Sequence, residues 1–224
     1  MNLKEVTICN VRCIIRYPNE YREGQRYPLL LFLHGAGTRG DDIQKLITHP
    51  FFELTQGHKD YPFVTIAPFC MENTWFDMWE RLLQAVKKCA ALPFVDSSRI
   101  YLMGASMGGY GAWQLAMSLP ECFAAMVPIS GGGMAWNAKR LVNIPAWAFH
   151  KEKDPTVSLD ESVKMVEAVN RVGGWAKLTV YPGEGHDAWS DTFSNIEVFS
   201  WLLEHENKNT SALVDEFVRT DIYG

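Results

Sequence analysis

The feature that most constrains the fold is a Gly-x-Ser-x-Gly sequence between a predicted buried strand and a predicted helix. The apolar run Ile100–Met103 leads into Gly104-Ala-Ser-Met-Gly-Gly109, and residues 108–118 have helical spacing of apolar side chains. The serine of such a strained turn needs glycine two positions away on each side, because larger side chains would collide with neighbouring backbone. The helix N-terminus also favours negative charge at this point. Ser106 is therefore the candidate nucleophile; the alternative, a tight turn around an inert serine, is disfavoured by the flanking strand and helix.

Short apolar runs alternate with longer helical patterns along the rest of the chain, which predicts the α/β class. Residues Val6–Tyr17 are expected to form one or two opening strands, followed by a turn-rich stretch over residues 18–28. Buried strands are expected at Leu29–Leu33, Phe63–Ala67, Ile100–Met103, Ala124–Ile129, Ala146–Phe149 and Lys177–Tyr181. Helices are expected at Trp79–Ala91, Gly108–Ser118, Leu159–Val172 and Phe193–Glu206. These elements predict a mostly parallel central sheet with helices on both faces.

The length of the chain favours a single domain. Its 224 residues, of which 47% are hydrophobic, suffice for one substantial core, and we find no internal repeat. We expect residues 1–206 to form this domain, without a large lid domain, so that the active site is fairly open. Residues 207–224 are expected to be a C-terminal extension that either folds back on the domain or reaches a neighbouring subunit.

Charge and hydropathy narrow the range of partners. A formal charge of −5 and a pI near 5.7 disfavour nucleic-acid binding, so a small-molecule substrate is the expected partner. The N-terminus shows no export signal, and the longest strongly apolar stretch, Pro28–Leu33, is too short to cross a membrane. We therefore expect a soluble cytoplasmic protein, either monomeric or a homo-oligomer.

Neither the cysteines nor the histidines show the spacing of a metal site, so we predict no metal and no other cofactor. The five cysteines are scattered and are interpreted as buried free thiols, with Cys9 and Cys13 on one face of a strand. Three histidines are interpreted as surface residues: His49, His58 and His205. For His150 we expect a packing or hydrogen-bonding role.

An acid and a histidine follow Ser106 at the ends of later predicted strands. The strand Ala146–Phe149 runs into a loop that contains Asp154, and Lys177–Tyr181 runs into a loop that contains His186. Because parallel strands deliver their carboxyl ends to one edge of a sheet, we expect His186 to accept the Ser106 proton and Asp154 to orient His186. The other carboxylates nearby are interpreted as solvated charges: Glu152, Asp160, Asp187 and Asp191.

A glycine-rich loop after the strand Leu29–Leu33 is expected to complete an oxyanion hole. The sequence here is His34-Gly-Ala-Gly37, and we predict that the backbone NH groups of Ala36 and Met107 bind the developing oxyanion. Gly37 NH is an alternative donor, and His34 is expected to hold the loop by hydrogen bonds.

The same loop also matches the Gly-x-Gly-x-x-Gly pattern of dinucleotide-binding proteins over residues 35–40. We disfavour this interpretation because Asp41 and Asp42 would repel a pyrophosphate and because the glycines do not open directly into a helix.

The segments LHGAG, GASMGGYGAW, HKEKDPTV and GEGHDAW resemble the α/β-hydrolase superfamily over about residues 28–204. They are most similar to small esterases and predicted peptidases related to the prolyl oligopeptidase catalytic domain, to polyhydroxybutyrate depolymerases and to feruloyl esterases. The resemblance implies the α/β-hydrolase fold, a triad of Ser106, Asp154 and His186, and an oxyanion hole of Ala36 and Met107. The sequence departs from these relatives at Lys151, where they often have glycine.

These features together predict a serine hydrolase that cleaves a carboxylic ester through an acyl-enzyme intermediate. A peptidase or amidase with the same triad is an alternative, and so is a hydrolase-fold binding protein with an idle triad. Several aromatic side chains fall near loops that follow strands, and we predict that Trp75, Trp79 and Trp189 bind the substrate. Core packing is the alternative role for each, and short-chain or aromatic esters are the expected substrates.

Overall fold

A computed structural model of the chain describes residues 3–58 and 60–208, so most of the predicted C-terminal extension lies outside the described residues. Eight strands form one sheet in the order β1-β2-β4-β3-β5-β6-β7-β8. All neighbouring strands from β4 to β8 in this order are parallel, whereas β2 pairs antiparallel with both β1 and β4. The strand bounds are β1 Leu3–Ile8, β2 Val11–Arg16, β3 Tyr27–Leu33, β4 Val64–Pro68, β5 Val95–Ala105, β6 Ala125–Ile129, β7 Ala146–Lys153 and β8 Ala176–Glu184.

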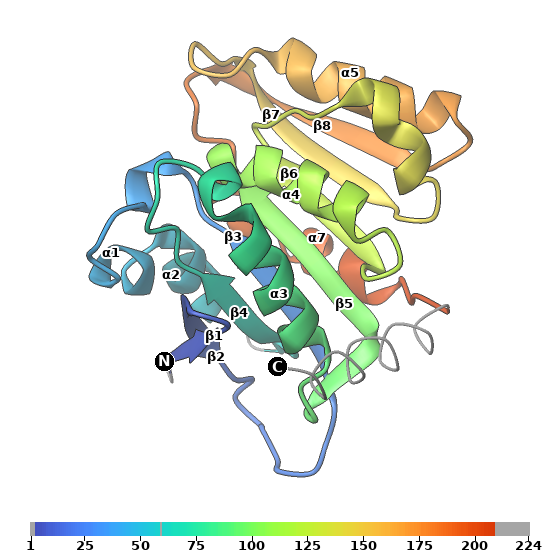
Figure 1. The fold of residues 1–224 in the computed structure, drawn as a ribbon. Coiled ribbons are helices and arrows are strands. Elements are labelled where there is room, and N and C mark those ends of the chain that lie inside the picture. Colours follow the sequence, from blue (N-terminus) through green and yellow to red (C-terminus); the bar gives the residue numbers. More distant parts are fainter. Residues whose placement is uncertain (1–2, 59, 209–224) are drawn as a thin grey trace.

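The side chains of the central strands point alternately to two apolar layers, one on each face of the sheet. On β3, Leu29, Leu31 and Leu33 pack in the first layer, whereas Leu30 and Phe32 pack in the second. Helices α3 Trp79–Ala90, α4 Met107–Ser118 and α5 Leu159–Arg171 cover the first layer. Helices α1 Gln44–Ile47, α2 Pro50–Gln56, α6 Trp189–Ser194 and α7 Ile196–Leu203 cover the second. In Figure 1, α3 and α4 lie in front of the sheet and α7 behind it, which confirms the predicted fold class.

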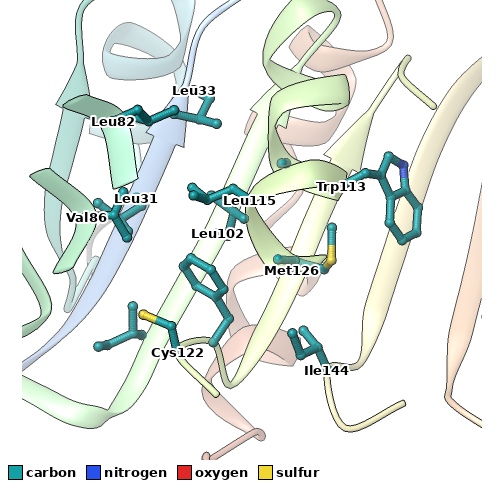
Figure 2. Packing of buried hydrophobic residues seen from close by; sticks show 14 of the residues in the cluster. Leu31, Leu33, Leu82, Val86, Leu102, Trp113, Leu115, Cys122, Met126 and Ile144 are labelled. Carbon is teal, nitrogen blue, oxygen red and sulfur yellow. The ribbon is translucent and has the colours of Figure 1, made fainter. Parts of the chain in front are cut away.

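The first layer is closely interdigitated, as Figure 2 shows. Leu82 and Val86 of α3 approach Leu31 and Leu33 of β3, and Leu115 of α4 lies against the sheet. All five side chains are fully or almost fully shielded from solvent. This packing fixes α4, and therefore its N-terminus, relative to the carboxyl ends of the strands.

The opening strands form a hairpin whose turn contains Cys9 and Asn10, with φ angles of 48° and 60°. Positive φ at both central positions is typical of the two-residue turns that match strand twist. Cys9 is exposed in this turn, so the prediction that it is buried and shares a strand face with Cys13 is wrong. The other four thiols are buried, as expected.

Two predictions for the second face are corrected by the tertiary structure. The helix expected over residues 193–206 is two helices, because Asn195 interrupts it and its side chain caps α7 by accepting the Glu197 NH. His49 and His58 are each only 8% exposed and are not surface residues. His49 caps α2, and His58 packs edge-on against Phe199 of α7.

Among residues 3–58 and 60–208, no helix has both the length and the apolar character needed to cross a membrane.

Candidate active site

Ser106 sits at the sharp turn between β5 and α4 with φ 56° and ψ −117°. A Cβ atom at Gly104 would lie 2.1 Å from the Gly108 carbonyl oxygen, and one at Gly108 would lie 2.0 Å from the Leu33 carbonyl oxygen. Both positions therefore require glycine, for the reason that the sequence pattern suggested. The turn holds the serine at the carboxyl edge of the sheet, at the N-terminus of α4.

Three side chains from separate loops meet at this edge. Nε2 of His186 lies 2.7 Å from Ser106 Oγ, and Nδ1 of His186 lies 2.6 Å from Asp154 Oδ2. Asp154 directly follows β7, and His186 follows β8. The structure thus brings together the serine, histidine and aspartate that the sequence singled out. A hydrogen-bonded chain of this kind can move the hydroxyl proton to the imidazole while the carboxylate stabilises the resulting imidazolium.

Asp154 is held as an oriented carboxylate. Its side chain has no exposed surface, and Oδ1 accepts hydrogen bonds from the backbone NH groups of Thr156 (2.8 Å) and Val157 (3.0 Å). Burial opposes ionisation, but the hydrogen bonds from His186, Val157 and Thr156 outweigh it, so that the pKa of Asp154 is lowered from its ordinary value. The carboxylate is therefore charged at neutral pH, with Oδ2 facing His186.

His150 supports the acid loop from below. It is completely buried, and its Nδ1 lies 2.8 Å from Ser162 Oγ on α5 while its Nε2–H donates to the Val157 carbonyl at 3.0 Å. The same Nε2 is 3.3 Å from Asp154 Oδ2. The expected hydrogen-bonding role is confirmed, but its proximity to the carboxylate was not predicted. The four-residue spacing from Asp154 was the available signal.

Ala36 begins a three-residue 3-10 turn and Met107 begins α4, so both are the first residue of a helical segment. A Cβ atom on Gly35 would lie 3.5 Å from Ser106 Cβ, so the loop after β3 passes close to the nucleophile. Within the described chain, neither the Ala36 NH nor the Met107 NH donates a hydrogen bond. A Cβ atom on Gly37 would meet no other atom within 4 Å, so this position faces open space. Two backbone donors are thus available next to Ser106 for a developing oxyanion.

His34 and Trp75 fix this loop from beneath. His34 is fully buried; its Nδ1–H donates to the Gly35 carbonyl (2.8 Å), and its Nε2 accepts the Cys70 NH (3.0 Å). Burial lowers the pKa of His34 to about 4, so the ring is neutral at pH 7. The indole NH of Trp75 donates to the His34 carbonyl at 3.1 Å, and Trp75 is 0% exposed. His34 therefore has the predicted structural role, and the prediction that Trp75 contacts substrate is corrected to core packing.

The other predicted aromatic residues lie closer to solvent. Trp79 is half-buried, stacks on Phe76 with ring centroids 5.5 Å apart, and lines an apolar pocket of about 580 Å³. The pocket's remaining walls are Tyr110, Gln114, Gly132, Gly133 and Met134. Trp189 presents its ring at right angles to the His186 imidazole, with centroids 5.1 Å apart. Tyr110 was not singled out from the sequence, although its place in the first turn after the elbow was visible there.

No cluster of three or more histidine, cysteine or acidic side chains suited to a metal ion occurs in the part of the chain that the structure describes.

A comparison with known protein families identifies the family of this chain. Residues 68–198, more than half of its length, match the dienelactone hydrolase family. The chain belongs to this family. Dienelactone hydrolases are members of the α/β-hydrolase superfamily, so the resemblance drawn from the four sequence segments is confirmed at the level of the superfamily. The assignment supports a hydrolase activity. None of the curated proteins is similar enough to the chain to count as a match.

Several solved structures share the fold of this dienelactone hydrolase family member. A thermostable esterase is 30% identical with a TM-score of 0.82, and the match covers 91% of this chain and 63% of the esterase. Est1E from Butyrivibrio proteoclasticus is 16% identical with a TM-score of 0.70, covering 91% and 98% of the two chains. Dipeptidyl peptidase 4 from Porphyromonas gingivalis is 13% identical with a TM-score of 0.67, covering 91% of this chain and 35% of the peptidase. At such low identity the last two show the fold alone.

Proposed function

We propose that this protein is a serine hydrolase that cleaves carboxylic esters through an acyl-enzyme intermediate. The observation that carries the proposal is the unbroken hydrogen-bond chain from Ser106 Oγ through His186 to Asp154, with bonds of 2.7 and 2.6 Å. The family assignment and the 30% identity to a thermostable esterase support ester hydrolysis.

The first half of the proposed reaction acylates the serine. Ser106 Oγ attacks the ester carbonyl carbon as its proton passes to His186 Nε2, while Nδ1–H remains bonded to the ionised Asp154. The carbonyl oxygen becomes an oxyanion that accepts hydrogen bonds from the NH groups of Ala36 and Met107. Collapse of the tetrahedral intermediate breaks the bond to the alcohol oxygen, which leaves with the proton from Nε2.

The second half reverses these roles with water. His186 removes a proton from a water molecule, the resulting oxygen attacks the acyl carbon, and a second tetrahedral intermediate forms in the same oxyanion hole. Its collapse returns the proton to Ser106 Oγ and releases the carboxylic acid. Asp154 stays ionised throughout, because its hydrogen bonds favour the charged form.

We propose that the pocket between Phe76 and Met134 receives an apolar or aromatic part of the ester. It begins one helical turn from the nucleophile, since the Tyr110 NH donates to the Ser106 carbonyl at 3.1 Å and Tyr110 lines the pocket. The stacked rings of Phe76 and Trp79 offer flat apolar surface in the lining of the same pocket. Trp189, next to His186, is proposed to contact the other side of the substrate.

A fluorophosphonate probe tests the proposal, because only an activated serine labels rapidly. We expect one labelled site at Ser106, no labelling in Ser106→Ala, and steeply reduced labelling in His186→Ala. Ser118→Ala, at the far end of the same helix, is the matched control and should label like the wild type. Labelling that persists in Ser106→Ala would refute the assignment.

Ester and amide cleavage are separated by paired substrates with one acyl group. p-Nitrophenyl acetate and acetyl p-nitroanilide differ only in the leaving atom, and we expect turnover of the ester to exceed that of the anilide by orders of magnitude. Comparable rates would favour a peptidase or amidase. A wild-type protein that neither labels nor turns over either substrate would instead be a binding protein with an idle triad.

A further inference from the structure

His150 is a buried histidine that the proposed reaction does not use. It lies in β7, four residues before Asp154, and its side chain has no exposed surface. Its Nε2 atom lies 3.0 Å from the Val157 carbonyl oxygen and 3.3 Å from Asp154 Oδ2. Both neighbours can only accept a hydrogen bond, because Asp154 is ionised, so Nε2 carries a hydrogen. The Nε2–H group donates to Val157, and its positive end lies next to the carboxylate of the triad.

The oxygen that His150 approaches is the same one that faces His186. Asp154 Oδ1 accepts the backbone NH groups of Thr156 and Val157, whereas Oδ2 lies 2.6 Å from His186 Nδ1. Rotation of the carboxyl group about its Cβ–Cγ bond would move Oδ2 out of line with His186. The two backbone bonds restrain this rotation at Oδ1, and the N–H of His150 restrains it at Oδ2 through its attraction to the negative charge.

The His150 ring is also held on its other side. Nδ1 lies 2.8 Å from Ser162 Oγ on α5, and this hydroxyl oxygen lies 3.0 Å from the Gly131 carbonyl oxygen. Ser162 is 1% exposed. Gly131 follows β6 and passes close to the first turn of α4, since a Cβ atom on Gly109 would lie 3.2 Å from Gly131 Cα. The imidazole therefore joins the acid loop to β7, to α5 and to the loop after β6, so that its position is fixed before a substrate binds.

We propose that His150 is a positioning residue for ester hydrolysis, whose Nε2–H keeps Asp154 Oδ2 in the orientation that His186 requires. The inference rests on the proposed function, because it assigns a second histidine to the acid of the same triad. His150 touches neither the substrate nor the reacting atoms and acts only through Asp154. Without its N–H, the distance between Oδ2 and His186 Nδ1 becomes less well fixed, and small displacements in a catalytic group are costly to the rate. The effect should fall on kcat and spare KM.

Steady-state hydrolysis of p-nitrophenyl acetate by folded variants tests the proposal. His150→Phe keeps a ring in the buried position but has no N–H, so kcat should fall about ten- to hundredfold while KM stays within about twofold of the wild type. His150→Gln places an amide NH near the position of Nε2, and its kcat should stay within about threefold of the wild type. His58→Phe is the matched control, because His58 is also buried but packs against Phe199 of α7. Its kcat should equal that of the wild type.

A double-mutant cycle with Asp154→Asn separates positioning from a purely structural role. Because His150 acts through the carboxylate, His150→Phe should change kcat by less than about threefold in the Asp154→Asn background. A purely structural role would lower the Tm of both backgrounds and leave the kcat of the folded protein unchanged. His150→Asn is a second variant, whose shorter amide reaches the position of Nδ1 but not that of Nε2. It should lower kcat as His150→Phe does, so the test does not depend on the folding of one variant.

A folded His150→Phe or His150→Asn protein with undiminished kcat overturns the proposal. A fall in kcat that is equally large in the Asp154→Asn background overturns it too, because His150 would then act by another route. The same holds for a His150→Gln protein as impaired as His150→Phe, since the N–H would not be the group that matters. Wild-type protein without turnover of p-nitrophenyl acetate refutes the proposed function and this inference with it. The other outcomes leave the proposed function intact, so the two failures are distinguishable.

Discussion

Replacing Asp154 with asparagine should invert the tautomer of His186 without changing the fold. Oδ1 accepts two backbone NH bonds, from Thr156 and Val157, so the amide oxygen of asparagine must take that place. Its NH₂ group then occupies the position of Oδ2, 2.6 Å from His186 Nδ1. Two donors cannot face each other, so Nδ1 becomes the acceptor and the proton moves to Nε2. The imidazole can then no longer accept the proton of Ser106.

The expected fall in kcat follows from the hydrogen bonding that the productive His186 tautomer loses in Asp154→Asn. A hydrogen bond to a charged group, about 1.5–3 kcal/mol, disappears, and a buried donor left facing another donor costs about 1–3 kcal/mol more. Together these terms raise the activation free energy by roughly 2.5 to 6 kcal/mol, which is about two to four powers of ten in kcat. KM should change little, because the Asp154 side chain has no exposed surface to offer a substrate.

The assay is p-nitrophenyl acetate hydrolysis with kcat and KM measured separately, accompanied by a thermal melt. Asp187→Asn is the matched control, since Asp187 adjoins His186 in sequence but bonds only to Ser190. Its turnover should be close to that of the wild type. A folded Asp154→Asn protein with undiminished kcat would refute the proposed role of the carboxylate.

Three further predictions concern the framework of the site. In denaturant unfolding, Gly108→Ala should lower the free energy of unfolding by more than about 3 kcal/mol, because the new Cβ would overlap the Leu33 carbonyl. The control Gly37→Ala places its Cβ in open space and should stay within about 0.5 kcal/mol of the wild type. Burial lowers the pKa of His34 from 6.5 to about 4. Between these two pH values the imidazole therefore binds a proton in the unfolded chain but not in the folded protein. Stability should therefore fall by up to about 3 kcal/mol between pH 6.5 and pH 4, and a flat profile would contradict the neutral buried ring. Trp79→Ala should raise KM for p-nitrophenyl benzoate about tenfold but leave KM for the acetate nearly unchanged; equal effects on both esters would remove Trp79 from the pocket.

The local sequence determined the turn that holds Ser106 and the positions of the other two triad residues after their strands. Gly104 and Gly108 mark this turn in the sequence. A Cβ atom at Gly104 would collide with the Gly108 carbonyl inside the turn, whereas one at Gly108 would collide with the Leu33 carbonyl of the neighbouring strand β3. Asp154 and His186 could be named because each follows a predicted strand, and parallel strands end at one edge of a sheet. Periodicity of apolar residues was likewise sufficient for the α/β class, since the pattern is repeated many times along the chain.

Only the tertiary structure decided which side chains those elements bury and which they leave free. Sequence could not distinguish Trp75, which bonds to the His34 carbonyl within the core, from Trp79, which lines a pocket, because both follow the same strand end. Arg16 is buried by Thr55 of α2 and the ring of Tyr61, and His58 packs against Phe199 of α7, so each side chain is covered by a segment tens of residues away along the chain. Burial is set by contacts between distant segments, and a single residue's neighbours in sequence carry little information about it.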